Sequence, residues 1–268
     1  MKFADKCYFR MSPDTTVDNK ISKKVYAREN NDSALTFVFD SDPNLCLEKN
    51  KIEIGFCVEI SDKYIPENGF ASKLFSSLAV EINSQLISTN KTRNEYPLID
   101  RLSKVGNFDS AFYTKAFITE GYFDIYSFTE LTDESDKKKL IDHRRKYLTP
   151  SNNSYRYQFI LVPNHGFLNT SKPLPPKTEL KLTFERATAD HSLIKVSEDS
   201  SLSGSVIKIS NAFAQTSFIS SPFLRNYFNQ IEIQPIKYTY EETSVVTRNI
   251  QTNQQIIRLE NIYGGDFN

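Results

Sequence analysis

Residues 51–60 read Lys-Ile-Glu-Ile-Gly-Phe-Cys-Val-Glu-Ile, and this stretch decides the fold class. Every second residue is apolar: Ile52, Ile54, Phe56, Val58 and Ile60. Because successive side chains of a β-strand point to opposite faces of a sheet, this spacing predicts a strand with one buried and one exposed face. We therefore expect the five apolar side chains to point into a hydrophobic core.

Other segments show the same kind of pattern. Residues 74–88 predict two strands joined by a tight turn at Asn83-Ser84. Further strands are predicted at 34–40, 155–162, 179–184, 206–209, 231–233, 236–240, 245–247 and 255–259. Short strands separated by turns, without long helices between them, are typical of an all-β fold, an antiparallel sandwich or jelly roll.

Two short helices are expected in the loops. Pro97, with apolar residues at 98, 99 and 102, predicts the first. The second is predicted at 133–147, where acidic residues come first and basic residues last, an order that complements the helix dipole.

The second predicted helix carries the one basic cluster of the sequence. Its members are Lys137, Lys138, Lys139, Arg144, Arg145 and Lys146. Such a cluster can contact nucleic acid or a neighbouring subunit. Because acidic residues flank it at 130–136, we interpret it as a solvated helix face.

The composition argues against several classes of protein. Lys and Arg number 33 and Asp and Glu also number 33, so no net charge favours general nucleic-acid binding. No stretch approaches the roughly 18 apolar residues of a membrane span. The N-terminus lacks the apolar region of a secretory signal. We expect a protein that is made and used in a reducing compartment.

The three cysteines fit that compartment. Cys7, Cys46 and Cys57 are too few and too widely spaced for a disulfide framework. Cys57 lies within an apolar run and is expected to be a buried free thiol.

No motif of a catalytic or cofactor site occurs in the sequence. Gly-rich phosphate loops, the G-x-S-x-G motif, C-x-x-C and H-E-x-x-H are all absent. Neighbouring acids, such as Asp133 with Glu134 or Glu241 with Glu242, point in different directions and make poor acid–base pairs. We therefore expect no catalytic, cofactor-binding or metal-binding residues, no cofactor and no enzyme activity.

The three histidines stand far apart. His143 lies in the predicted helix, His165 in a Pro-Asn-His-Gly turn and His191 in a predicted loop. Each is interpreted as an ordinary side chain. A metal site would need the fold to bring two or three ligands together, which the sequence alone does not decide.

One block of sequence resembles a known family. Residues 74–88, L-F-S-S-L-A-V-E-I-N-S-Q-L-I-S, are followed by Tyr96-Pro97-Leu98-Ile99-Asp100. This order of strand, turn, strand, Tyr-Pro and short helix resembles the double jelly-roll major capsid proteins of Polinton/Maverick elements and adintoviruses, in the adenovirus-like lineage. The segments 180–187, 207–212 and 235–238 are similar to later strands of the same family.

The polar, aperiodic residues 1–30, the polar stretch 197–204 and the resemblance together divide the chain into four parts. Residues 1–30 are expected to form an N-terminal arm and residues 31–196 the first jelly roll. Residues 197–204 are expected to be a linker. Residues 205–268 would begin a second jelly roll that is shorter than the family's.

The resemblance also implies a structural role. In the family, three chains form a pseudo-hexagonal trimer, and the trimers tile an icosahedral shell. We therefore expect a homotrimeric, self-assembling capsid protein of a virus or virus-like transposon. Its expected partners are neighbouring capsomers and penton or minor capsid proteins, without sequence-specific nucleic acid or a membrane span. The expected location is the virion, assembled in the host cytoplasm or nucleus and not secreted.

Two other classes stay open at this point. A β-sandwich that binds carbohydrate or a receptor would expose an aromatic platform, for which the candidates are Tyr113, Tyr122, Tyr126 and Tyr155. An enzyme on a jelly-roll scaffold would need one of the three histidines to converge with carboxylates. Fold alone does not decide among the three classes.

Overall fold

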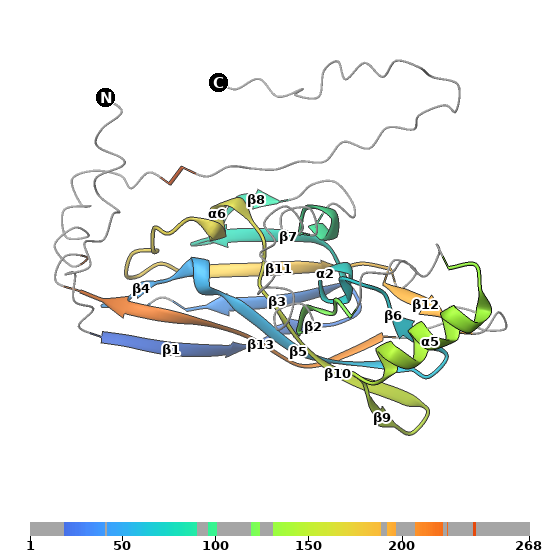
Figure 1. The fold of residues 1–268 in the computed structure, drawn as a ribbon. Helices are drawn as coiled ribbons and strands as arrows, with labels where there is room; N and C mark the ends of the chain where they lie inside the picture. The colour runs from blue at the N-terminus through green and yellow to red at the C-terminus, as the bar shows by residue number, and fades with distance from the viewer. Residues whose placement is uncertain are drawn as a thin grey trace, which may run out of the picture.

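The computed structural model describes residues 19–40, 42–89, 96–100, 119–123, 131–188, 192–196, 207–221, 224 and 238–239. Within these residues, two antiparallel sheets form the two layers of a sandwich (Figure 1). A smaller sheet, in which β12 (Leu193–Lys195) pairs with β6 (Tyr64–Pro66), lies at one end.

The larger sheet, here called sheet A, is built around one long strand. It runs in the order β1 (Asn19–Tyr26), β13 (Ile207–Ser220), β5 (Glu53–Ser61), β10 (Ser154–Leu161) and β9 (Thr149–Ser151). The short strand β4 (Cys46–Leu47) also pairs with β13. β13 pairs with β1 along one side and with β5 along the other, so it joins the N-terminal strand to the centre of the sandwich.

The second sheet, here called sheet B, faces sheet A. It runs in the order β2 (Glu29–Asn30), β3 (Ala34–Phe39), β11 (Leu180–Arg186), β7 (Phe75–Ile82) and β8 (Gln85–Thr89). Successive long strands alternate between the sheets: β3 lies in sheet B, β5 in A, β7 in B, β10 in A and β11 in B. β11 returns between β3 and β7, which closes the roll beside its first strand. This wrapping confirms the predicted antiparallel jelly-roll sandwich.

The helices are short, as expected. They are η1 (Lys49–Lys51), α2 (Phe70–Lys73), α5 (Glu134–Arg145) and α6 (Gly166–Asn169). Residues 96–100 are also helical, which confirms the helix predicted at Pro97. α5 confirms the helix predicted at 133–147, and its first turn is capped by Asp133, whose side chain accepts a hydrogen bond from the backbone N–H of Ser135. No helix among the described residues has both the length and the apolar composition for a membrane span.

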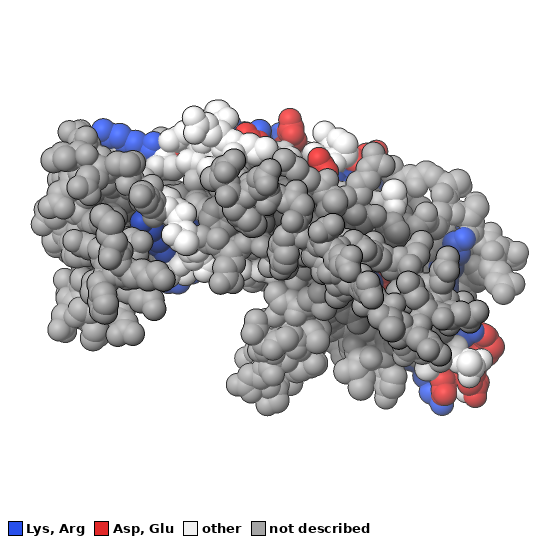
Figure 2. All heavy atoms as spheres, turned by 90° about the horizontal axis from the view of Figure 1, so that it is seen from above, with Lys and Arg blue, Asp and Glu red and all other residues white. Residues whose placement is uncertain are grey.

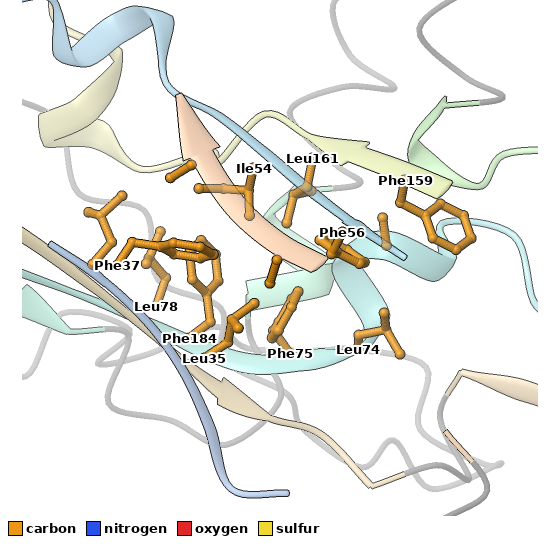
Figure 3. Close-up of a cluster of buried hydrophobic side chains, with 14 of the residues drawn as sticks. Leu35, Phe37, Ile54, Phe56, Leu74, Phe75, Leu78, Phe159, Leu161 and Phe184 are labelled. Atoms are coloured by element: carbon orange, nitrogen blue, oxygen red, sulfur yellow. The ribbon is translucent and has the colours of Figure 1, made fainter. Parts of the chain in front are cut away.

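The core lies between the two sheets. Figure 3 shows Ile54 and Phe56 of β5 pointing across it toward Phe37, Phe184 and Phe75 of sheet B. The five apolar residues predicted to face inward from segment 51–60 are all buried, with exposed fractions of 0–3%. Truncating any one of these well-packed side chains to alanine would cost about 2–5 kcal/mol.

The predicted N-terminal arm is corrected by the structure. Residues 19–30 do not form an arm, because β1 and β2 are paired strands of the sandwich. The prediction of an arm followed from the lysines of β1 (Asn-Lys-Ile-Ser-Lys-Lys-Val-Tyr). Ile21, Lys23 and Val25 occupy alternate positions, and the lysine among them breaks the apolar pattern expected of a strand. Residues 1–18 lie outside the described residues.

The predicted start of the second jelly roll is also corrected. A strand at 206–209 is confirmed, but it extends to Ser220 and pairs with β1 and β5, so Ile207–Ser220 completes the first sandwich. The predicted linker at 197–204 and the strands predicted at 231–233, 245–247 and 255–259 lie outside the described residues, as does most of 236–240. A second jelly roll after Ser220 stays a prediction.

Cys57 is half-buried and not fully buried as expected. Its neighbours Phe56 and Val58 point inward, so strand alternation turns the side chain of Cys57 to the outside of sheet A. Cys46 is the buried thiol of the described residues, and burial raises its pKa to about 12.

Candidate assembly surface

The outward face of sheet A carries a row of apolar residues, two of them exposed and one, Phe213, half-buried. Strand pairing places Tyr26 of β1 opposite Phe213 of β13, Phe213 opposite Gly55 of β5, and Gly55 opposite Ile160 of β10. These residues therefore lie side by side across four strands, and we call Tyr26, Phe213 and Ile160 the apolar row. Tyr26 is 66% exposed and Ile160 is 40% exposed. Val162, just beyond β10, is exposed as well.

A bulge in β13 sets the position of Phe213. Ser210 pairs with Cys57 and Phe213 pairs with Gly55, so two residues of β13 stand opposite Phe56 alone. One of them, Asn211, has a φ of 51°, in the left-handed region that asparagine tolerates better than most residues. The extra residue shifts the alternation of β13 by one position, so that Phe213 points outward, whereas strict alternation from Ile207 and Ile209 would turn it inward.

Gly55 provides the space for Phe213. A Cβ atom at residue 55 would clash with the ring of Phe213, which lies directly over the glycine backbone. Glycine is unfavourable inside a strand because it has no side chain to pack and more backbone freedom to lose. Here it leaves room for the far end of the Phe213 ring on the outward face.

Charged side chains surround the apolar row. The ammonium of Lys24 lies 3.5 Å from the ring centroid of Phe213 and 5.4 Å from that of Tyr26. Glu53 accepts a hydrogen bond from Gln215 at 2.7 Å on the same face. The result is an apolar centre with a polar rim of both charges, the arrangement found in protein–protein interfaces.

The other end of this face holds a second polar group. Glu59 accepts a hydrogen bond from the hydroxyl of Ser154 at 2.8 Å and lies 3.4 Å from Nε of Arg156. The hydrogen bond from Ser154, followed by the charge of Arg156, lowers the pKa of the Glu59 carboxyl. The carboxylate therefore stays charged near neutral pH and keeps this part of the rim polar.

The edge strands of the two sheets differ in charge. β1, at the edge of sheet A, presents Lys20, Lys23 and Lys24, and Lys23 forms an ion pair with Asp42 at 2.7 Å. Lysines on an edge strand oppose pairing with a further strand. β8, at the edge of sheet B, reads Gln-Leu-Ile-Ser-Thr, has no charge and exposes 55% of Leu86.

The predicted basic cluster divides into structural and solvated residues. Arg144 is fully buried, and its guanidinium donates to the carbonyl oxygen of Pro66 at 2.9 Å. Lys137 pairs with Glu134 within the same helix, as does Lys139 with Asp136. Figure 2 shows acidic and basic side chains next to one another at the end of the molecule where α5 lies. This mixture favours the interpretation as a solvated helix face.

The described histidines have local structural contacts. The ring of His165 is buried and caps α6, with Nδ1 accepting from the backbone N–H of Phe167 at 3.3 Å. His143 is half-buried, with Nε2 3.3 Å from the carbonyl oxygen of Phe123. His191 lies outside the described residues. Within the described ranges, no group of three or more His, Cys, Asp or Glu residues is placed to hold a metal ion.

The predicted tyrosine platform is not brought together by the described residues. Tyr122 is buried, which excludes it from an exposed platform. Tyr155 is half-buried, and the guanidinium of Arg145 lies 5.4 Å from its ring centroid. Tyr113 and Tyr126 lie outside the described residues.

Solved structures share this fold. A chain of the Sputnik virophage, known from cryo-EM, matches with a TM-score of 0.50 and 8% identity over 76% of this chain and 48% of its own. The protein shares its fold with a virophage protein. VP54 of PBCV-1 matches with a TM-score of 0.44 and 14% identity, over 83% of this chain and 48% of its own. The mavirus major capsid protein matches with a TM-score of 0.38 and 13% identity, over 82% and 51%.

The likeness concerns the fold and only part of each neighbour. The chain spans about half the length of the solved structures it matches. No protein-family model matches the sequence, and no curated protein matches it.

Sequence reasoning missed the apolar row because its three members come from three separate segments. Tyr26 was assigned to an arm and Phe213 to another domain, and only strand pairing brings them together. The signal present in the sequence was Gly55, the one residue in the predicted strand 51–60 that lacks a side chain. A glycine inside a strand indicates a close approach by another group.

Proposed function

We propose that this chain is a structural subunit of a virus or virus-like shell, and that copies of it assemble through the outward face of sheet A. The observation that carries the proposal is the apolar row across four strands of a jelly roll. A sheet that buries one face in its own core and carries the exposed Tyr26 and Ile160 and the half-buried Phe213 on the other is suited to a second packing contact. The fold shared with a virophage chain supports this role by analogy.

The composition of the face suits subunit packing. A stable protein–protein contact buries roughly 800 Å² on each partner and places apolar and aromatic residues at its centre. The face spans strands β1, β13, β5 and β10, with Phe213 on a central strand, Tyr26 on the edge strand and charged residues around them. Packing of a second sheet against this face, at about 10 Å, would cover the row as the core of a sandwich is covered.

We further propose the finer points implied by the resemblance to double jelly-roll capsid proteins. The capsomer is a homotrimer, residues after Ser220 lead into a second jelly roll, and the shell is icosahedral. The protein is then a virion component whose partners are neighbouring capsomers and penton or minor capsid proteins. This role requires contacts between surfaces and no catalytic residue.

The test is the mass of the purified chain by light scattering on a sizing column, over a range of concentrations. A trimer or a larger particle is expected. A monomer at every concentration would contradict the shell function and favour a binding module.

A further inference from the structure

Tyr238 lies well beyond β13 in the sequence and yet packs against the first sandwich. Its hydroxyl donates to the carbonyl oxygen of Pro173 at 2.9 Å. Its ring contacts Phe167 of α6, with the ring centroids 5.5 Å apart. The side chain is half-buried against the hydrophobic core. Both ends of the tyrosine, the ring and the hydroxyl, are thus used in the contact.

The surface under Tyr238 contains a buried ammonium group. Lys49 of η1 is only 1% exposed, and its Nζ donates to the carbonyl oxygens of Thr170 at 2.8 Å and Lys172 at 2.6 Å, and also to the hydroxyl of Thr170. All three ammonium protons therefore have acceptors. Among the described residues, no carboxylate lies within ion-pair distance of Lys49. A buried cation without a carboxylate needs another source of electrostatic stabilisation.

Aromatic rings supply that stabilisation. Nζ of Lys49 lies 5.1 Å from the ring centroid of Phe167 and 5.6 Å from that of Tyr238. Nζ of Lys172 lies 4.9 Å from the ring centroid of Tyr238. The electron-rich face of an aromatic ring attracts cations at these distances. One tyrosine therefore covers two lysines that repel each other, and burial together with Lys172 lowers the pKa of Lys49 to about 7.

The site is held in place without Tyr238. The backbone N–H of Leu47 donates to the carbonyl oxygen of Leu174 at 3.0 Å, and the reverse bond is 2.9 Å. These two bonds fasten β4, which precedes η1, to the loop that follows α6. We call the surface formed by Lys49, Phe167, Thr170, Lys172 and Pro173 the lysine socket.

We propose that the lysine socket is the docking site for the segment that follows β13, with Tyr238 as its anchor. The contact joins three regions of the sequence, at η1, after α6 and at Tyr238. It goes beyond the shell function, because it is a contact within one chain, between Tyr238 and the first sandwich. It does not require assembly, so a monomeric chain would show it equally well.

The experiment measures how fast Lys49 reacts with N-hydroxysuccinimidyl acetate in the full chain, with each lysine followed by mass spectrometry. Lys51, which is two residues away and half exposed, is the internal reference. Tyr238→Ala is expected to raise the rate at Lys49 several-fold, because the group that covers it is gone. Tyr238→Phe keeps the ring and is expected to leave the rate near that of the wild type.

Two controls make the result decisive. Tyr155→Ala removes another half-buried tyrosine next to a cation, Arg145, and is expected to leave Lys49 protected. The thiol of Cys46, which is buried, reports whether each variant is folded. Should Tyr238→Ala expose Cys46, Tyr238→Leu replaces it, since leucine keeps apolar volume without an aromatic face. The docking proposal is overturned if Lys49 stays protected without the aromatic ring, or if Tyr155→Ala exposes it to the same extent.

Discussion

The ring of Phe213 lies over the backbone of Gly55, at a distance that leaves no space for a side chain at residue 55. The two residues are paired on neighbouring strands, β13 and β5, and both belong to the outward face of sheet A. Through this contact, the glycine in the central strand β5 determines where the ring of Phe213 lies on the outward face of sheet A.

Replacing Gly55 by alanine should therefore displace the ring of Phe213. We expect Gly55→Ala to destabilise the fold by about 1–3 kcal/mol, the usual cost of overpacking. The double variant Gly55→Ala/Phe213→Ala should recover most of this loss, since the clash is gone. Urea unfolding midpoints of the two single variants and the double variant measure the coupling. Additive effects of the two substitutions would show that the ring does not press on residue 55.

We expect Arg144 to contribute to the stability of the fold and not to a charged binding surface. Its guanidinium is buried and bonded to the carbonyl oxygen of Pro66, so Arg144→Met leaves that buried acceptor without this donor. We expect a loss of about 2–3 kcal/mol in the free energy of unfolding, typical of a buried hydrogen bond to a charged group. The exposed neighbour Lys146 is the control, and Lys146→Met should change stability by less than about 0.5 kcal/mol. Equal effects in thermal unfolding would mean that Arg144 is an ordinary member of the basic cluster.

A substitution in the turn between β7 and β8 is expected to stabilise the fold. Asn83 and Ser84 have φ values of 48° and 65°, as in the two-residue turn that favours Asn-Gly. A serine in this region is strained by about 1 kcal/mol relative to glycine. Ser84→Gly should therefore raise the melting temperature, and Ser84→Val should lower it. A melting temperature that falls in Ser84→Gly would contradict the turn geometry.

We expect Lys49 to make the free energy of unfolding vary with pH above about pH 7. Its pKa is about 7 in the folded chain, against the model-peptide value of 10.5, and the groups that face it are Lys172, Tyr238, Phe167 and Thr170. Between these two pKa values the unfolded chain binds more protons at Lys49, so this residue makes stability rise with pH across that window. Below about pH 7 both states are protonated and the contribution becomes constant. Lys49→Met should flatten the rise in urea unfolding curves, and an unchanged slope would show that Lys49 titrates normally.

The strands could be predicted where their own sequence alternates. β5, β10 and β11 have apolar residues at every second position, and each was found within two residues of its predicted bounds. β1 was missed because lysines occupy both sides of an edge strand, where burial does not demand an apolar residue. An alternating sequence pattern indicates which residues are buried. The outward face of sheet A is largely unburied, so such a pattern does not reveal its residues.

The pairing of distant strands could not be predicted from local pattern. The start of β13 was predicted as a strand but was assigned to the second jelly roll. Its own sequence does not indicate that it pairs with β1 and β5. The apolar row depends on that pairing and on a bulge at Asn211. The lysine socket depends on contacts between residues more than 60 positions apart, such as Tyr238 and Pro173.

The central claim is that the outward face of sheet A holds copies of this chain together. The most direct measurement is the solution mass of three proteins side by side: the wild type, Ile160→Lys and Leu86→Lys. Both substitutions place a charge at an exposed apolar position, but Ile160 lies in the apolar row and Leu86 at the edge of sheet B. We predict a trimer or larger particle for the wild type and for Leu86→Lys, and a folded monomer for Ile160→Lys. An Ile160→Lys variant that assembles like the wild type would place the contact elsewhere, and a wild type that stays monomeric would contradict the shell function itself.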